Sequence, residues 1–325
     1  MSKNYKPATT GVNLKTWIRP LLSLVAILFL TSGLSAQQTV EADDKTEVVR
    51  VLTIGNSFAN NACLYLKPIA ESANVRIEIG TANLGGCTLE RHARLAAQSD
   101  LDPSVKPYRD GREKKSLQEY LRSQKWDFVT LQQMSALSFQ PESYHPYLEQ
   151  LVGHIKENAP ETAMLMHQTW AYRSDSRLLK SKKMDQQAMY EGLQAAYADA
   201  SRQISAPIIP VGIAFQLARN APGHEVLVVD PDFDYKNPVA GSLPKQTNSL
   251  TTGWYWRDVN GKPKLQLDTN HANKKGCFLG GLVWYEVLTG KDARQTTYLP
   301  EGFDPAEGTF FREIAHQAVQ GRADQ

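Results

Sequence analysis

The segment Val48–Ser57, which reads VVRVLTIGNS, decides the fold class of this chain. Its β-branched and aliphatic start is typical of a buried strand, and it ends in Gly55-Asn56-Ser57. A serine on a sharp turn between a strand and a helix projects its hydroxyl above the sheet edge. The N-terminus of the following helix favours negative charge there. The alternative is that Ser57 only caps that helix, which is a common role for serine.

The rest of the chain alternates predicted strands with predicted helices. Further strands are expected at Val75–Ile79, Trp126–Leu131, Ala163–His167 and Pro207–Val211, the last at a sheet edge because of its prolines. Helices are expected at 62–73 (with a kink or shift at Pro68), Tyr144–Asn158, Asp185–Ile204, Lys274–Leu288 and Glu307–Val319. This alternation predicts an α/β fold of three layers, α/β/α, around a mostly parallel five-stranded sheet. Ligands of such sheets bind beyond the carboxyl ends of the strands, so the residues that follow each strand are candidates for a site.

The first 36 residues have the pattern of a secretory signal peptide. Four basic residues precede the short apolar run Leu21–Leu30, and small residues follow up to Ala36. The run is too short for a membrane span, which needs about 20 apolar residues. We therefore expect a secreted or periplasmic protein that is not attached to a membrane after cleavage. Residues 37–47 are expected to be a flexible lead-in, and 48–325 a single domain with an insertion at about 220–267.

Charge and cysteine content exclude several classes of protein. The chain has 325 residues and a formal net charge of +2, which falls to −2 without the four basic residues of the leader. No basic patch indicates a nucleic-acid partner. Three cysteines (Cys63, Cys87 and Cys277) exclude a disulfide framework, although one bridge of unassigned pairing stays open. Their spacing fits no zinc site, and Asp230–Asp234 lacks the later ligands of a calcium loop, so no metal or cofactor is expected.

Polar residues and glycines follow several of the predicted strands. Gly85-Gly86 comes after the second strand, and a backbone N–H there could serve an oxyanion hole. Gln132-Gln133 follows the third strand, where a side-chain amide could serve the same purpose or cap the next element. Asp268 precedes His271 by three residues just before a helix, so the carboxylate could hold the imidazole, unless the two are a solvated pair in a loop.

Other residues are candidates for binding a substrate. His167 ends the fourth strand, and Trp170 follows it closely. Trp254 lies in the insertion, where Asn260-Gly261 indicates a hairpin turn. Flat aromatic faces suit the apolar faces of sugar rings, although core packing is the more common role of any one such residue.

The order of these motifs resembles that of the SGNH (GDSL-like) hydrolases, in particular a bacterial group that reads Gly-Asn-Ser-Phe in its first block. Gly55-Asn56-Ser57-Phe58 resembles the first block, Gly86 the glycine of the second, and Asp268-Thr269-Asn270-His271 the last. The third block departs from the usual Gly-x-Asn-Asp: Gln132-Gln133-Met134-Ser135 looks more like the Gln-Gly-Glu-Ser of sialate and xylan acetylesterase relatives.

The resemblance implies a flavodoxin-like SGNH fold and a serine esterase. Ser57, Asp268 and His271 would form a catalytic triad, and the oxyanion hole would use the backbone N–H groups of Ser57 and Gly86 and the side chain of Gln132. Asn56, Gly85, Gln133, His167, Trp170 and Trp254 would contact the substrate. The expected substrate is an O-acylated, in particular O-acetylated, carbohydrate. A non-catalytic glycan-binding protein of the same fold and an O-acyltransferase stay open as alternatives, and the oligomeric state is not predicted.

Overall fold

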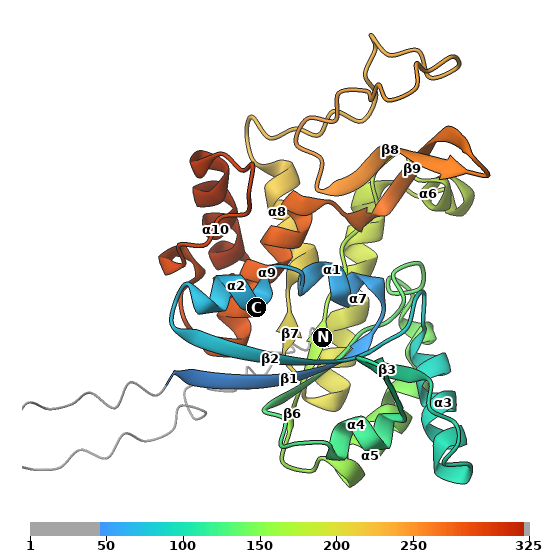
Figure 1. Cartoon of the computed structure of the whole chain (residues 1–325), viewed down its shortest axis with the longest axis vertical. Helices are drawn as coiled ribbons and strands as arrows, with labels where there is room; N and C mark the ends of the chain where they lie inside the picture. The colour runs from blue at the N-terminus through green and yellow to red at the C-terminus, as the bar shows by residue number, and fades with distance from the viewer. Residues whose placement is uncertain (1–45, 322–325) are drawn as a thin grey trace, which may run out of the picture. The chain divides into compact units, whose positions relative to one another are not determined.

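A parallel sheet of five strands lies at the centre of residues 46–321, which are the residues that the computed structural model describes (Figure 1). Its strands run in the order β2 (Val75–Asn83), β1 (Glu47–Gly55), β5 (Phe128–Leu131), β6 (Ala163–His167) and β7 (Ile208–Ile209). The predicted signal peptide and most of the lead-in lie outside the described residues. Within these residues, no helix is long and apolar enough to cross a membrane.

The connections change direction between β1 and β5. From β1 the chain moves to β2 on one side, and from β5 it moves through β6 to β7 on the other. The crevice that such a switch opens at the carboxyl ends of two neighbouring strands is the usual ligand site of an open α/β sheet. Ser57 follows β1 and Gln132 follows β5, so both residues lie at this position.

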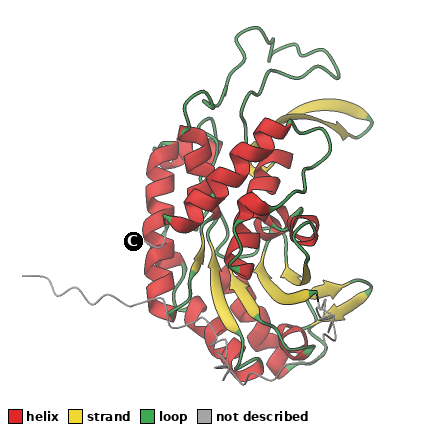
Figure 2. Ribbon diagram, turned by 90° about the vertical axis from the view of Figure 1, so that its left-hand side faces the viewer, coloured by secondary structure: helices red, strands yellow, loops and turns green. Residues whose placement is uncertain are grey.

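Helices cover both faces of the sheet (Figures 1 and 2). One face carries α1 (Ser57–Ala62), α2 (Leu66–Glu71), α8 (Val211–Asn220), α9 (Lys274–Thr289) and α10 (Pro305–Gln320). The other carries α3 (Leu89–Leu101), α4 (Leu117–Arg122), α5 (Tyr147–Asn158) and α7 (Gln186–Ile204). The predicted fold class, three layers around a parallel five-stranded sheet, is therefore confirmed.

Several elements differ from the sequence prediction. The single helix expected at 62–73 is two short helices, α1 and α2, and the break lies before Pro68. Pro68 falls in the first turn of α2, where a backbone N–H has no partner in the helix and its loss costs nothing. The short hairpin of β3 (Tyr108–Asp110) and β4 (Glu113–Lys115) was not predicted, nor were α4, α6 (Arg177–Lys182) and α8.

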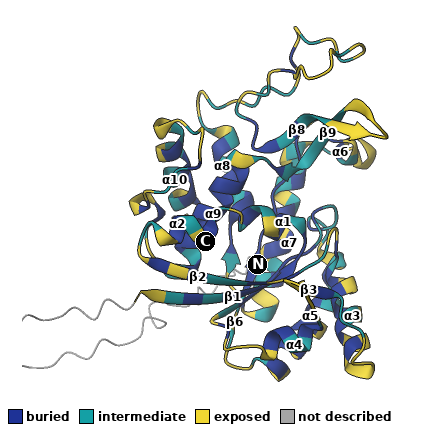
Figure 3. Ribbon diagram, in the orientation of Figure 1, coloured by how far each residue is buried: buried dark blue, intermediate teal, exposed yellow. Residues whose placement is uncertain are grey.

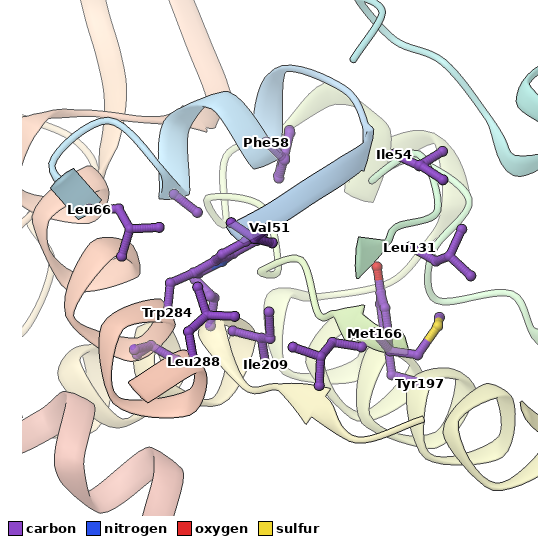
Figure 4. Packing of buried hydrophobic residues seen from close by; sticks show 14 of the residues in the cluster. Val51, Ile54, Phe58, Leu66, Leu131, Met166, Tyr197, Ile209, Trp284 and Leu288 are labelled. Atoms are coloured by element: carbon purple, nitrogen blue, oxygen red, sulfur yellow. The ribbon is translucent and has the colours of Figure 1, made fainter. Parts of the chain in front are cut away.

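Helix α9 is buried on nearly all sides and forms the centre of one helical layer (Figure 3). Figure 4 shows Trp284 and Leu288 of this helix against Val51 of β1 and Ile209 of β7. Two glycines let α9 approach α1 and α2 closely. A Cβ at Gly281 would lie 2.9 Å from Ile69 Cδ1. Because this layer holds α1 against the sheet, it also fixes the turn that carries Ser57.

The 220–267 region combines a long loop with a hairpin. Residues 221–250 contain neither helix nor strand, and β8 (Thr251–Val259) then pairs with β9 (Lys262–Ala272). Asn260 and Gly261 have φ angles of 56° and 76°, as a tight two-residue hairpin turn requires. Strand β9 continues through His271, so the Asp268–His271 motif lies on a strand and not in a loop.

Candidate active site

Ser57, His271 and Asp268 form a chain of hydrogen bonds at the carboxyl end of the sheet. Ser57 Oγ lies 2.9 Å from His271 Nε2, and His271 Nδ1 lies 2.8 Å from Asp268 Oδ2. Asp268 Oδ1 also accepts the backbone N–H of His271 at 2.9 Å. The structure therefore brings Ser57 to Asp268 and His271, which lie more than 200 positions later in the sequence, in the geometry in which a carboxylate orients an imidazole toward a hydroxyl.

The electrostatics of this group favour a proton acceptor at His271. The hydrogen bond to Asp268 raises the pKa of His271, and this effect exceeds the opposing effect of burial. Burial acts to raise the pKa of Asp268, but hydrogen bonds from the His271 ring and from two backbone N–H groups outweigh it and lower the pKa. Asp268 therefore stays ionised near neutral pH. The His271 side chain is 40% exposed, so solvent can reach it.

Four contacts hold the end of β9 that carries His271. The backbone N–H of Ala272 donates to Asn61 Oδ1 at 3.2 Å, and Thr252 Oγ1 donates to the carbonyl of His271 at 3.3 Å. Trp170 Nε1 donates to the carbonyl of Asn270 at 2.8 Å. The backbone N–H of Arg173 donates to the carbonyl of Thr269 at 2.9 Å, so the strand is tied both to α1 and to the loop after β6.

Asn56 shapes the turn before Ser57. It is the N-cap of α1: its Oδ1 accepts the N–H of Phe58 at 3.1 Å, and its Nδ2 donates to the carbonyl of Cys87 at 3.1 Å. The side chain is 1% exposed. Its expected role as a substrate contact is therefore wrong, because both ends of the amide already bind protein groups. Ser57 is not the cap but the first residue of the helix, which leaves its hydroxyl free for His271.

The backbone N–H groups of Ser57 and Gly86 lie in the turn that begins α1 and in the neighbouring loop. Ser57 begins α1, and Gly86 lies in the loop that Asn56 holds through Cys87. Neither N–H has an acceptor among residues 46–321. Gly86 has a φ of 58°, which a side chain would strain, and both Gly85 and Gly86 are exposed. The glycine pair therefore offers free backbone beside the Ser57 turn.

Gln132 and Gln133 do not face the site. Gln132 is fully buried, its Nε2 donates to Asn56 Oδ1 at 2.7 Å, and its Oε1 accepts His167 Nδ1 at 3.0 Å. Gln133 is also fully buried, and it binds the backbone of Leu89 and Ser143. The predicted oxyanion role of Gln132 and the predicted substrate contact of Gln133 are therefore both wrong. A residue directly after a parallel strand can point into the core, and the sequence alone does not show this.

His167 lies beneath the site and not in a pocket. It is fully buried, and its ring meets Trp284 edge-on with the centroids 5.0 Å apart. Burial lowers the pKa of His167 to about 3, so it is neutral, and its Nδ1–H donates to Gln132. The expected substrate contact of His167 is therefore wrong. The residue supports Gln132, which in turn supports Asn56.

The two tryptophans that were candidates for binding sugar have different positions. Trp170 is fully buried, stacked between Phe58 at 4.3 Å and Phe215 at 4.5 Å, so its expected contact with substrate is wrong. Trp254 is half-buried on β8 and lines a cavity of about 540 Å³. This cavity lies between the β8–β9 hairpin and α6, and Asn270 also lines it. Asn270 directly precedes His271 on β9, and its Nδ2 lies 3.5 Å from His271 Nδ1, so the cavity adjoins the strand end that carries His271.

The sequence prediction assigned no role to one residue that supports the site. His92 of α3 is fully buried, its Nε2 lies 2.9 Å from the carbonyl of Gly55, and its Nδ1 lies 2.8 Å from Tyr108 Oη. Burial lowers the pKa of His92 to about 4, so the neutral ring donates to Gly55 and accepts from Tyr108. The pattern of the sequence gave no sign of this contact, because Tyr108 belongs to the unpredicted hairpin.

The cysteines and the remaining acidic groups have structural surroundings. The three cysteines are free: Cys87 and Cys277 are buried and Cys63 is half-buried. Asp230 accepts the backbone N–H groups of Asp232 and Lys245. Away from the site, Glu286, Asp292 and His316 lie close together, but Glu286 also accepts the N–H of Ala293, and Arg294 pairs with Asp292. His316 Nδ1 lies 2.8 Å from Glu286 Oε1, and this contact ties α10 to α9.

The fold and the site define an α/β protein with a Ser-His-Asp group at the switch point of its sheet, in agreement with the predicted resemblance to SGNH hydrolases. Residues 50–234 match the model of the DUF4886 family, a domain of unknown function, and the chain belongs to this family. No match was found among curated proteins.

Solved structures extend this comparison. A DUF4886 family protein from Bacteroides uniformis is 27% identical with a TM-score of 0.66, over 84% of this chain and 95% of that one. A protein from Slackia heliotrinireducens, provisionally named an SGNH hydrolase, is 21% identical with a TM-score of 0.46, over 74% of this chain and 98% of that one. A lipase/acylhydrolase from Enterococcus faecalis is 12% identical with a TM-score of 0.41, over 74% and 96%. The last two comparisons concern the fold only.

Proposed function

We propose that this protein is a secreted serine esterase that removes O-acyl groups, in particular O-acetyl groups, from a carbohydrate. The observation that carries the proposal is the hydrogen-bonded series Ser57, His271 and Asp268, with distances of 2.9 Å and 2.8 Å. It lies beside free backbone N–H groups at the switch point of a parallel sheet. A nucleophile, a base and an oxyanion site within reach of one another define acyl transfer.

The reaction has two steps. Ser57 Oγ attacks the ester carbonyl while His271 Nε2 takes its proton, and collapse of the tetrahedral intermediate breaks the bond to the sugar oxygen. His271 then gives the proton to the leaving alcohol. Water attacks the acyl-enzyme with His271 again as the base, which releases the acid and restores Ser57. Asp268 holds the ring and stabilises its charged form in both steps.

The oxyanion would be held by the backbone. The donors would be the backbone N–H groups of Ser57 and Gly86. Gln132, the third donor predicted from the sequence, is left out because its side chain is buried and already binds Asn56. Loss of one such donor typically costs about 10²–10³ in turnover. The N-terminus of α1 adds a favourable field at the same place, because Ser57 is its first residue.

The carbohydrate part of the proposal is supported by the cavity next to Asn270. Trp254 and Tyr172 give it aromatic walls, and Gln266 and Asn270 give it amide groups. Aromatic faces with a few hydrogen-bonding groups suit sugar rings. Export is supported by the signal-peptide pattern of residues 1–36.

Acetate release from 4-nitrophenyl acetate and from acetylated xylan tests the proposal. Ser57→Ala should lose about 10⁵–10⁶ of the turnover, by comparison with other serine triads. Ser72→Ala, which changes a partly buried serine after α2, should keep it. Circular dichroism would check that both variants are folded. Equal activity of the wild type and Ser57→Ala would rule out Ser57 as the nucleophile.

A further inference from the structure

The cavity between the β8–β9 hairpin and α6 has a charge that the esterase reaction does not require. We call it the hairpin groove. It has a volume of about 540 Å³, and its walls include Tyr172, Arg177, Trp254, Lys264, Gln266 and Asn270. Two of the lining residues are basic and none is acidic. Figure 1 shows α6 beside the two strands of the hairpin, at the end of the molecule away from β1.

The two basic side chains are free to bind a ligand. Arg177 is the first residue of α6, and Lys264 lies on β9; both residues are exposed. Among residues 46–321, neither forms an ion pair with a carboxylate within 4.0 Å, whereas the neighbouring Arg173 is buried and paired with Asp175. A guanidinium and an ammonium in one concave surface are well suited to a carboxylate or sulfate.

The surroundings of the hairpin groove strengthen this charge. Helix α6 and its C-cap, residues 177–183, contain four basic residues and no acidic one. The hairpin tip adds Arg257 and Lys262, against Asp258, whose carboxylate accepts the N–H of Gly261. The concentration is local, because the chain without its leader has a net charge of −2. Figure 3 shows that the tip of the hairpin is exposed.

The structure assigns the hairpin groove as a subsite for a negatively charged sugar unit next to the scissile ester, so that the substrate is an acidic glycan. This inference rests on the proposed function for the position of the ester. Asn270 lines the groove and directly precedes His271 on β9, so a sugar unit in the groove would lie on the side of the site where this strand ends. The aromatic walls take the sugar face, and Arg177 and Lys264 take its anionic group.

Binding to the Ser57→Ala variant tests the subsite without cleavage. Calorimetry would compare unacetylated oligogalacturonate, a sulfated galactan oligosaccharide and neutral xylo-oligosaccharide. We expect at least one acidic oligosaccharide to bind about tenfold more tightly than the neutral one, and the tighter of the two identifies the anion as carboxylate or sulfate. Raising the salt concentration from about 0.05 M to 0.5 M should remove most of this preference.

Two double variants in the Ser57→Ala background complete the test. Arg177→Gln with Lys264→Gln should abolish the preference for the acidic ligand and leave neutral binding within about twofold. The control variant, Arg122→Gln with Lys156→Gln, removes one arginine and one lysine from exposed positions of α4 and α5, and it should keep the preference. Equal affinity for acidic and neutral ligands, or an unchanged preference in the first double variant, would overturn the inference. The proposed function fails separately, if no ester is cleaved.

Discussion

Replacement of Gln132 by leucine separates a structural role from a catalytic one. Gln132→Leu keeps the approximate volume but removes both hydrogen bonds, to Asn56 Oδ1 at 2.7 Å and from His167 Nδ1 at 3.0 Å. Asn56 retains the N–H of Phe58 as a donor, whereas the buried His167 Nδ1–H loses its acceptor. A buried donor without a partner costs about 1–3 kcal/mol and each lost hydrogen bond about 1 kcal/mol. We therefore expect the free energy of unfolding to fall by about 2–4 kcal/mol.

The assay is urea unfolding of residues 37–325, together with turnover of 4-nitrophenyl acetate where the variant is folded. Because Gln132 reaches Ser57 only through Asn56, the turnover number should fall less than about tenfold. Gln124→Leu, a matched change at an exposed position, should alter stability by less than about 0.5 kcal/mol. A loss of about 10²–10³ in turnover with unchanged stability would refute this reasoning and restore Gln132 as an oxyanion donor.

Two further predictions concern the residues around His271. His271 must be neutral to accept the serine proton, and Asp268 raises its pKa above the ordinary 6.5, so activity should fall as the pH decreases through a midpoint above 6.5. Asp268→Asn should move this midpoint to lower pH and reduce kcat/KM at least about 100-fold. A pH profile with an unchanged midpoint would contradict the role of Asp268. Trp170→Phe keeps a ring in the buried stack but removes the 2.8 Å hydrogen bond to the carbonyl of Asn270. Thermal unfolding should therefore show a free energy of unfolding that is lower by about 1–3 kcal/mol. An unchanged stability would mean that this hydrogen bond does not hold strand β9.

The helices and strands that could be predicted are those with a strong local pattern. The β-branched run of β1, the mainly apolar run of β6 and the long helices α5, α7 and α9 lie within a few residues of their predicted bounds. The short elements α6 and β3–β4 carry no clear periodicity over a few residues, and they form because the rest of the fold holds them. The Asn260-Gly261 turn was predictable because its φ angles are a local property of these residues.

The residues of the candidate site also differ in whether the sequence alone could predict them. Ser57, Asp268 and His271 could be proposed from the sequence because each belongs to a short motif next to a strand or helix end, and strand ends in a parallel sheet meet at one edge. The direction in which a side chain at the end of a strand points could not be predicted from the sequence. Gln132 follows β5 and His167 ends the neighbouring strand β6, yet both point into the core and bind each other. Only the packing of Trp284 and Asn56 around them decides this direction.

The sequence by itself determined the fold class, the three residues of the proposed triad and the aromatic character of the hairpin, because strand periodicity, turn chemistry and motif order are local. The tertiary structure decided which polar residues support the site from below and which line a cavity. The hairpin groove joins Arg177 of α6 to Lys264 of β9, and their shared cavity depends on how the hairpin folds back over α6. No local sequence pattern predicts such a contact, because it forms only when segments that are distant in the chain pack together.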